Sequence, residues 1–286
     1  MFKRIVGCAV VTLLLIAAVA AAGSAPHLQT IVQKGKITIG LNVDYPPFCL
    51  WHDGSPRGFD VELSRAIVAK MGLDPQKDIT FVPVKAAEAV AALTSGKVDL
   101  VVAGLTVTSE RAKRIAFTRP YYTATIAGLL ARSKVPQIQH ENLVRPMPMA
   151  SVKDLKKIEP LVVAVKEKTT IEHKVRLILR NSKVVAYPNM RAATQAVIDG
   201  RADVLVHEDP YLRHMAAGKF AGAGRFKPLT APATTERLAI ACRQGDPHFV
   251  SWLNIALDEL ADAGLLKAWE KEYFDSAAWR QEVPWK

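Results

Sequence analysis

The sequence predicts an α/β protein built from two units, because strand and helix patterns alternate twice along its 286 residues. In the first unit, strands are expected at 36–41, 79–84 and 98–103, and helices at 63–71 and 87–94. In the second unit, strands are expected at 161–165, 184–186 and 204–206, and helices at 171–179 and 192–198. Such alternation is typical of a largely parallel sheet that is covered by helices on both faces.

The spacing of apolar residues supports each of these elements. Ile37, Ile39 and Leu41 alternate with polar or small residues, which is the period of a half-buried strand. Apolar residues of segment 63–71 instead recur every three or four positions, as on one face of a helix, and Gly72 ends that helix. The other strands and helices follow from the same two periods.

The remaining segments connect or close the two units. The prolines of 45–48 predict a rigid loop, and 137–151, which contains Pro146 and Pro148, predicts an irregular surface segment. A further strand is expected at 237–243, and closing helices are expected at 249–260 and 265–274.

The first 22 residues predict a cleavable signal peptide. Lys3 and Arg4 precede an apolar stretch, Ile5–Val19, and a run of small residues follows it. The stretch is shorter than the ~20 apolar residues that span a bilayer. Cys8 precedes most of this stretch, so we expect secretion without a lipid anchor.

The chain is basic, with a formal net charge of +11. A basic chain suggests nucleic-acid binding, but its densest basic runs, 111–114 and 153–157, are short and lack interleaved aromatic residues. We therefore expect a solvated basic surface, no nucleic-acid partner, and a weak preference for anionic ligands or membranes.

The cysteines and histidines give little sign of special chemistry. Cys49 and Cys242 remain after signal-peptide removal, and an oxidising compartment permits a disulfide that the sequence does not decide. The seven histidines show no metal-ligand spacing, and His207 and His214 are expected at the surface. We expect no metal and no cofactor.

Ordered blocks of residues run through nearly the whole mature chain. They are 40–48 (GLNVDYPPF), 58–63 (GFDVEL), 95–100 (SGKVDL), 103–111 (AGLTVTSER), 117–122 (FTRPYY), 163–166 (VAVK) with Thr169 and Thr170, and 200–206 (GRADVLV). Each block alone is weak. Together and in this order, they resemble the bacterial extracellular solute-binding family that serves polar amino-acid ABC importers.

The resemblance implies a type II periplasmic-binding-protein fold, in which two lobes close over the ligand. Lobe 1 would comprise 23–124 and 238–286, and lobe 2 would comprise 125–237. Two hinge strands, at 123–126 and 238–241, would join them. The resemblance also implies a monomeric periplasmic protein that captures an amino acid or a related small zwitterion or anion. A membrane permease of an ABC importer would receive the ligand.

A zwitterionic ligand needs a cationic fork, an anion and apolar walls. Arg111 stands in the first turn of a helix that Thr108 or Ser109 caps, just past a strand end, where ligands of open α/β sheets bind. From its position alone, Arg111 could either bind the ligand carboxylate or be an ordinary exposed arginine of a helix. The resemblance favours the first role. Thr106 is expected to donate to the same carboxylate, and the Gly104 carbonyl to accept from the ammonium.

The second lobe is expected to supply a helix start. Thr169 and Thr170 begin a helix, and Thr169-x-x-Glu172 fits a capping box. Free N–H groups there favour an anion. The resemblance implies a glycine where this chain has Lys168. Lys166, at the end of its strand, is expected at the cleft wall, where it favours an acidic or amide ligand side chain.

The ligand ammonium is expected to meet a carboxylate. Glu208 stands where the resemblance implies this group, and Asp209 beside it is the alternative. Tyr45 is expected to form an apolar wall, and Asn42 to contact the ligand. The family often has an aromatic residue at the position of Ala86, so the identity of the ligand does not transfer from the resemblance.

An enzyme is the main alternative. Periplasmic dehydratases that act on prephenate or arogenate share this fold and similar blocks, and Glu208 or Asp209 would serve as the acid in such an enzyme. Binding alone explains Arg111, Thr106 and Glu208. We therefore expect a binding protein that catalyses no reaction.

Overall fold

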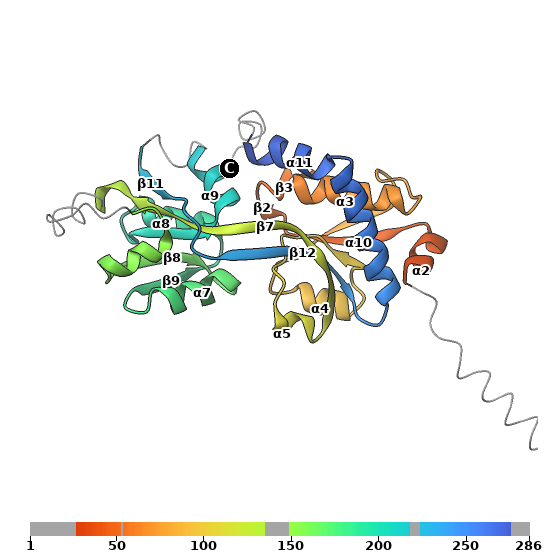
Figure 1. Ribbon diagram of the computed structural model, residues 1–286, viewed down its shortest axis with the longest axis horizontal. Coiled ribbons are helices and arrows are strands. Elements are labelled where there is room, and N and C mark those ends of the chain that lie inside the picture. The colour runs from red at the N-terminus through yellow and green to blue at the C-terminus, as the bar shows by residue number, and fades with distance from the viewer. Residues whose placement is uncertain (1–26, 53, 135–148, 218–223, 276–286) are drawn as a thin grey trace, which may run out of the picture.

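The computed structural model describes residues 27–52, 54–134, 149–217 and 224–275. The expected signal peptide and most of the proline-containing segment lie outside the described residues. Figure 1 shows two α/β lobes side by side, with β7 (Ile115–Ala131) and β12 (Thr235–Arg243) running between them. The predicted two-lobed fold is confirmed.

Lobe 1 is built around three strands. β1 (Ile37–Leu41) lies between β5 (Ile79–Pro83) and β6 (Leu100–Val101) and is parallel to both. Its helices are α2 (His27–Lys34), α3 (Phe59–Lys70), α4 (Ala89–Thr94), α5 (Ser109–Ala112), α10 (Pro247–Asp262) and α11 (Leu265–Glu270), followed by a π-helical turn, η4 (Lys271–Asp275).

Lobe 2 repeats this arrangement. β8 (Val162–Lys166) lies between β9 (Lys183–Tyr187) and β10 (Val204–Glu208) and is parallel to both, while β11 (Phe226–Leu229) pairs with β7. Its helices are α7 (Thr170–Ile178), α8 (Met190–Ile198) and α9 (Asp209–Ala217), with the 3-10 turns η1 (Arg132–Lys134) and η2 (Val152–Ile158).

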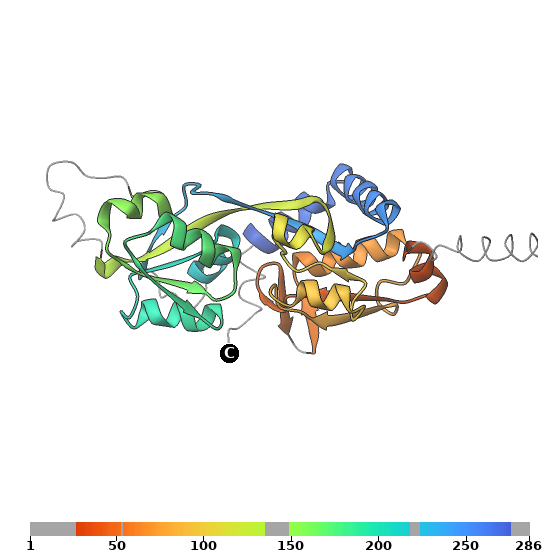
Figure 2. The same cartoon turned by 90° about the horizontal axis from the view of Figure 1, so that it is seen from below.

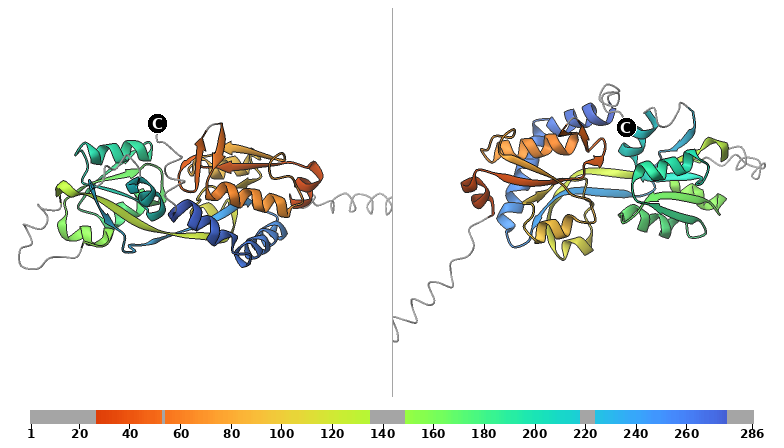
Figure 3. Two further views of the ribbon diagram at one scale, coloured as in Figure 1. Left: turned by 90° about the horizontal axis from the view of Figure 1, so that it is seen from above. Right: turned by 180° about the vertical axis from the view of Figure 1, so that it is seen from behind.

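Two antiparallel strands connect the lobes. β7 is 17 residues long, and its end pairs with β10 of lobe 2, from Ile126 opposite Glu208 to Leu130 opposite Val204. β12 pairs with the rest of β7 and with β6 of lobe 1. Figures 2 and 3 show these two strands as the ribbon that joins the lobes. The lobe boundaries expected at 124/125 and 237/238 fall within them.

Each lobe has an apolar core. In lobe 2, Val163, Val165 and Val204 pack against Ile171 and Val175 of α7. In lobe 1, an aromatic cluster joins segments from both ends of the chain, with Phe48, Phe59, Tyr121, Tyr122, Trp269 and Phe274 as its members. The C-terminal segment therefore completes the lobe that the N-terminal segment begins.

The rigid loop expected at 45–48 is only partly correct. The prolines do make a turn, but β2 (Asp44–Tyr45), β3 (Cys49–His52) and β4 (Ser55–Arg57) form a small antiparallel sheet around it. These strands are two to four residues long, and such short runs carry no clear alternation of apolar residues.

α9 was not predicted, although its start has a local signal. Pro210 follows Asp209 at this start. Proline is common in the first helical turn because N–H groups there have no partner within the helix, so a residue without an N–H loses no hydrogen bond. The predicted closing helix 265–274 is present as α11 and η4 together. None of the described helices combines the length and apolar character needed to cross a bilayer.

Cys49 and Cys242 are free thiols in the structure. Both lie in the core of lobe 1, where burial raises the pKa of Cys242 to about 12 and that of Cys49 well above its ordinary value. Neither thiol is therefore a reactive thiolate at neutral pH.

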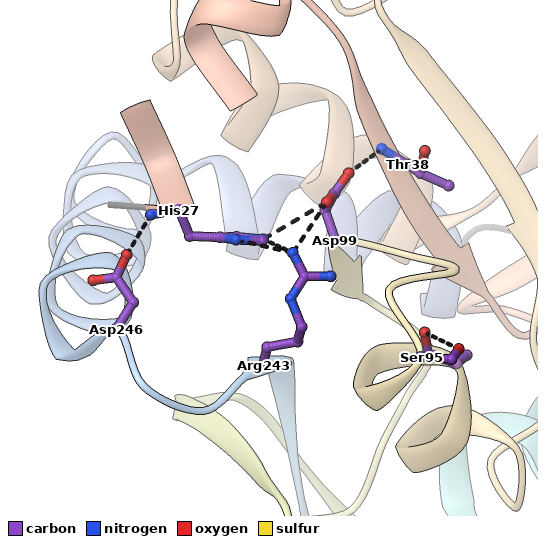
Figure 4. A network of polar contacts seen from close by, with 7 residues as sticks. His27, Thr38, Ser95, Asp99, Arg243 and Asp246 are labelled. Atoms are coloured by element: carbon purple, nitrogen blue, oxygen red, sulfur yellow. Dashed lines mark hydrogen bonds and ion pairs between the residues drawn. The ribbon is translucent and has the colours of Figure 1, made fainter. Parts of the chain in front are cut away.

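Polar contacts fasten α2 to lobe 1 (Figure 4). The N–H of His27 donates to Asp246 Oδ2 at 2.6 Å, and Arg243 Nη2 lies 2.9 Å from the His27 ring. Asp99 accepts from the N–H of Thr38 at 2.9 Å and faces both the His27 ring and the Arg243 guanidinium. Burial and the charge of Arg243 lower the pKa of His27, although Asp99 and Asp246 act to raise it. The ring is therefore neutral at pH 7.

Candidate functional site

A cavity of about 240 Å³ lies between the two lobes. All nine residues that the sequence proposes as ligand contacts line it: Asn42, Tyr45, Gly104, Thr106, Arg111, Lys166, Thr169, Thr170 and Glu208. Its other lining residues are Lys85, Ala86, Ala87, Glu88, Glu167, Lys168, Ile171, Pro188 and His207. The cavity is therefore rich in charged side chains of both signs.

The parallel strands explain this convergence. Asn42 directly follows β1, while Lys166 and Glu208 end β8 and β10. Thr106 lies in the segment between β6 and α5. In an open α/β sheet the carboxyl ends of parallel strands share one edge, and ligands bind outside it. The two lobes turn these edges toward each other.

Arg111 is held by its own helix start. Thr108 caps α5 by accepting from the N–H of Arg111 at 3.2 Å, and Arg111 Nη1 donates to the Thr106 carbonyl at 2.7 Å. Burial lowers the pKa of Arg111, and the negative charge of Glu236 opposes that effect. Within the described ranges no carboxylate forms an ion pair with this guanidinium. The Thr106 carbonyl therefore positions the guanidinium, and its positive charge favours an anion.

Gly104 and Tyr45 pack in close contact. The φ angle of Gly104 is 56°, and a Cβ on it would lie 2.3 Å from the Tyr45 ring. The N–H of Gly104 donates to Tyr121 Oη at 3.1 Å, and that hydroxyl donates to Asp60 Oδ1 at 2.7 Å. Only glycine fits here, because both the backbone angle and the ring exclude a side chain.

Side chains of the two lobes meet around the cavity. Thr106 Oγ1 of lobe 1 lies 3.4 Å from Thr170 Oγ1 of lobe 2. The Tyr45 ring packs edge-on against His207, with ring centroids 5.6 Å apart, and stacks on Tyr211 at 6.1 Å. The structure therefore shows the lobes closed on each other.

The start of α7 differs from the predicted capping box in one bond. Thr169 Oγ1 accepts from the N–H of Glu172 at 3.2 Å, as predicted. The Glu172 carboxylate, however, accepts from the N–H of Lys168 at 2.9 Å, one residue before the cap. The reason is the backbone at Lys168, whose φ of 58° turns its N–H toward the helix.

Lys168 holds a backbone angle that usually belongs to glycine. The left-handed region costs an L-residue ~1–2 kcal/mol. The lysine side chain is exposed and reaches Glu167 at 3.5 Å, an ion pair of little value in water. The glycine that the resemblance implies here would adopt the same angle without that cost.

We expect Lys168→Gly to raise the free energy of unfolding by ~0.5–1 kcal/mol, because the relief of backbone strain exceeds the added entropy of the unfolded chain. Urea unfolding of both proteins measures the difference. Lys168→Ala removes the same ion pair but keeps the Cβ, so it is the control and should not stabilise. Equal free energies for the glycine and alanine variants would contradict this account.

Glu208 is almost fully buried, and its carboxylate contacts the ring of His207. Both residues are 4 % exposed, and Glu208 Oε2 is in ion-pair contact with His207 Nδ1. Burial alone would raise the pKa of Glu208, but the charge and hydrogen bond of His207, with help from Tyr45, lower it. The carboxylate is therefore ionised inside the closed cleft.

Two expectations about histidine were wrong. His207 and His214 were expected at the surface, but they are 4 % and 3 % exposed. His207 lies in β10, where every residue is buried because the strand runs between β7 and β8 in the middle of the sheet. The run of apolar residues 204–206 before His207 is typical of a strand that is buried on both faces, and such a strand places His207 in the interior as well.

Asp209, the alternative to Glu208, does not line the cavity. It begins α9 and pairs with Arg213 at 2.8 Å.

Lys166 lies at the cavity wall, as expected. Asp44 lies nearby: desolvation raises its pKa, and the charges of Lys166 and Arg191 oppose that effect. Ala86 lines the cavity and provides no aromatic wall.

Comparison with known proteins agrees with this architecture. Residues 37–276 match the model of the bacterial extracellular solute-binding proteins, family 3. The L-arginine-binding protein of Pseudomonas aeruginosa is 28% identical over 86% of this chain and 91% of its own. The ABC transporter glutamine-binding protein GlnH of Bacillus subtilis is 25% identical over 94% and 98%.

A solved structure gives the same result in three dimensions. It is the crystal structure of an ancestral amino acid-binding protein described as a precursor of cyclohexadienyl dehydratase. This chain matches it with a TM-score of 0.72 and 30% identity, over 86% of this chain and 99% of that one.

Proposed function

Because the chain belongs to family 3 of the bacterial extracellular solute-binding proteins, we propose that its cleft captures an amino acid or a related small anion for an ABC importer. The observation that carries this proposal is that Arg111 and Glu208 line the same interlobe cavity. One group is a cation without a carboxylate partner in the described part of the chain, and the other is a buried, ionised carboxylate. A zwitterion offers the complement of both.

Each lobe has a defined part in this proposal. In lobe 1, Arg111 binds the ligand carboxylate as a bidentate fork, and Thr106 adds a hydroxyl donor. In lobe 2, the N–H groups at Thr169 and Thr170 complete the anion site at the start of α7. A ligand that contacts both lobes favours the closed arrangement over the open one.

The other end of the ligand meets a different set of groups. Glu208 and the Gly104 carbonyl accept from the ammonium, Tyr45 covers the ligand from one side, and Asn42 adds an amide. The names of the relatives above include arginine and glutamine as ligands of those proteins. These two ligands differ in side-chain charge, so the side chain that this protein prefers depends on the groups that line its own cavity.

We propose an acidic or amide side chain. Lys85 and Lys166 both line the cavity, so a cationic side chain would face like charges there. A carboxylate or carbonyl oxygen would accept hydrogen bonds from either ammonium. Ala86 leaves no flat aromatic surface for a large apolar ligand.

Calorimetry with the purified mature protein tests this proposal. We expect L-glutamate or L-glutamine to bind at least tenfold more tightly than L-arginine or L-lysine, and Lys166→Met to reduce that preference. Lys156→Met, an exposed lysine of η2 away from the cavity, is the control. A wild-type preference for cationic amino acids, or an unchanged ranking in Lys166→Met, would contradict the side-chain argument alone.

Secretion and oligomeric state complete the proposal. The family is described as extracellular, which agrees with a secreted, periplasmic protein. We propose that the mature protein is monomeric and that it catalyses no reaction. Light scattering measures the first point, and incubation with prephenate and arogenate tests the second.

A further inference from the structure

A buried chain of hydrogen bonds runs from α3 to the cleft. Asp60 stands in the first turn of α3 and is fully buried, and its Oδ1 accepts from Tyr121 Oη at 2.7 Å. The same hydroxyl accepts from the N–H of Gly104 at 3.1 Å. Gly104 lines the cavity, whereas Asp60 and Tyr121 lie behind it. The chain therefore links a carboxyl group inside lobe 1 to a backbone group at the cleft.

Asp60 decides which way the Tyr121 hydroxyl points. A tyrosine hydroxyl has one hydrogen to donate and lone pairs with which to accept. Since Asp60 Oδ1 takes the hydrogen, the lone pairs are left for the N–H of Gly104. Burial raises the pKa of Asp60 to about 7, so both of its forms occur near neutral pH. Its Oδ2 has no hydrogen-bond partner in the described ranges, so a proton there leaves the bond to Tyr121 intact.

Gly104 needs such a contact to keep its backbone conformation. Its φ of 56° is one of several conformations open to glycine, and neighbouring groups must select it. On the C-terminal side, the carbonyl of Leu105 accepts from the N–H of Ala239 in β12 at 3.1 Å. On the N-terminal side, the Tyr121 hydroxyl holds the N–H of Gly104 itself. The hinge strand and Tyr121 therefore restrain this glycine from its two sides.

We infer that Tyr121 is a positioning residue for the ligand, because its hydroxyl holds the Gly104 backbone where the Gly104 carbonyl accepts from the ligand ammonium. The inference deepens the proposed function and rests on it. Without the hydroxyl, the N–H of Gly104 loses its acceptor and the glycine is free to turn its carbonyl away. Binding of an amino acid then weakens, whereas an acid without the amino group makes no use of this carbonyl.

Tyr121→Phe tests the inference, since it removes the hydroxyl and keeps the ring that stacks on Phe59. The probes are L-glutamate and glutarate, which is the same acid without the amino group. Calorimetry measures both affinities, by displacement of glutamate where glutarate binds weakly. We expect the variant to bind glutamate roughly fivefold more weakly, as for one lost hydrogen bond, and glutarate less than about twofold more weakly. If wild type prefers L-arginine, arginine and deamino-arginine replace the two probes.

Tyr122→Phe is the matched control. It removes a hydroxyl from the next residue of β7, whose ring packs against Phe48 and Phe274, and it should leave both affinities unchanged. If Tyr121→Phe fails to fold because Asp60 loses its donor, the double variant Asp60→Asn/Tyr121→Phe is compared with Asp60→Asn. Unchanged glutamate affinity, or an equal loss for both probes, overturns the inference and leaves the proposed function standing. A wild type that binds none of these compounds overturns both.

Discussion

Replacing Arg111 with alanine is expected to abolish ligand binding at ordinary concentrations while leaving the fold intact. The ligand carboxylate would be buried in the closed cleft without its bidentate partner, and truncating one member of a buried charge pair costs ~2–5 kcal/mol. That range corresponds to roughly a 30-fold to several-thousand-fold loss of affinity. Calorimetry with the tightest wild-type ligand measures the loss.

Arg114→Ala provides the comparison for this variant. Arg114 is exposed, lies three residues further along the chain and does not line the cavity. Its replacement by alanine removes the same charge as Arg111→Ala without changing the cavity. Arg111→Lys, which keeps the charge but loses the planar fork, should lie between wild type and alanine. Near wild-type affinity in Arg111→Ala would show that Arg111 is a structural helix residue.

The buried carboxylate of Asp60 is expected to make the stability of the fold depend on pH near neutrality. Asp60 is 0 % exposed, its Oδ1 accepts from Tyr121, and its Oδ2 has no hydrogen-bond partner within the described segments. Burial raises the pKa of Asp60 from 3.8 to about 7, and the hydrogen bond from Tyr121 only partly offsets this rise.

The direction of the effect follows from proton binding. The unfolded chain releases this proton near pH 4 and the folded chain near pH 7, so the folded state holds one more proton between these values. The free energy of unfolding therefore falls as pH rises through this window, and this group adds no pH dependence outside it. A shift of roughly three pKa units corresponds to ~4 kcal/mol, which is the upper bound for the loss.

Asp60→Asn removes this titration and keeps an acceptor for Tyr121. We expect its free energy of unfolding, relative to wild type, to rise by up to ~2.6 kcal/mol between pH 5 and pH 8, because part of the titration of the unfolded chain lies below pH 5. Urea unfolding at both pH values measures the change. Asp262→Asn, at an exposed position of α10, should show no such change. A constant difference between Asp60→Asn and wild type would mean that Asp60 is ionised throughout this range.

Local sequence patterns were sufficient for most of the secondary structure, and together with the family resemblance they identified half of the residues that line the cavity. The alternation of Ile37, Ile39 and Leu41 predicts β1, and the three- and four-residue spacing within 63–71 predicts α3. These periods reflect backbone geometry, which each segment carries alone. The ordered blocks then placed all nine proposed contacts at strand ends and helix starts, where the structure has them around one cavity. Their roles toward a ligand remain predictions.

Only the tertiary structure decided what each of these side chains contacts. His207 looked like a surface residue, yet β10 lies inside the sheet and closure of the lobes packs Tyr45 against its ring. Asp60 is buried against Tyr121, 61 positions away. Burial and charge pairing depend on segments that are distant in sequence, so no local pattern encodes them. The sequence by itself identified half of the residues that surround the cleft, and only the folded chain decided which of their charges are paired within the protein.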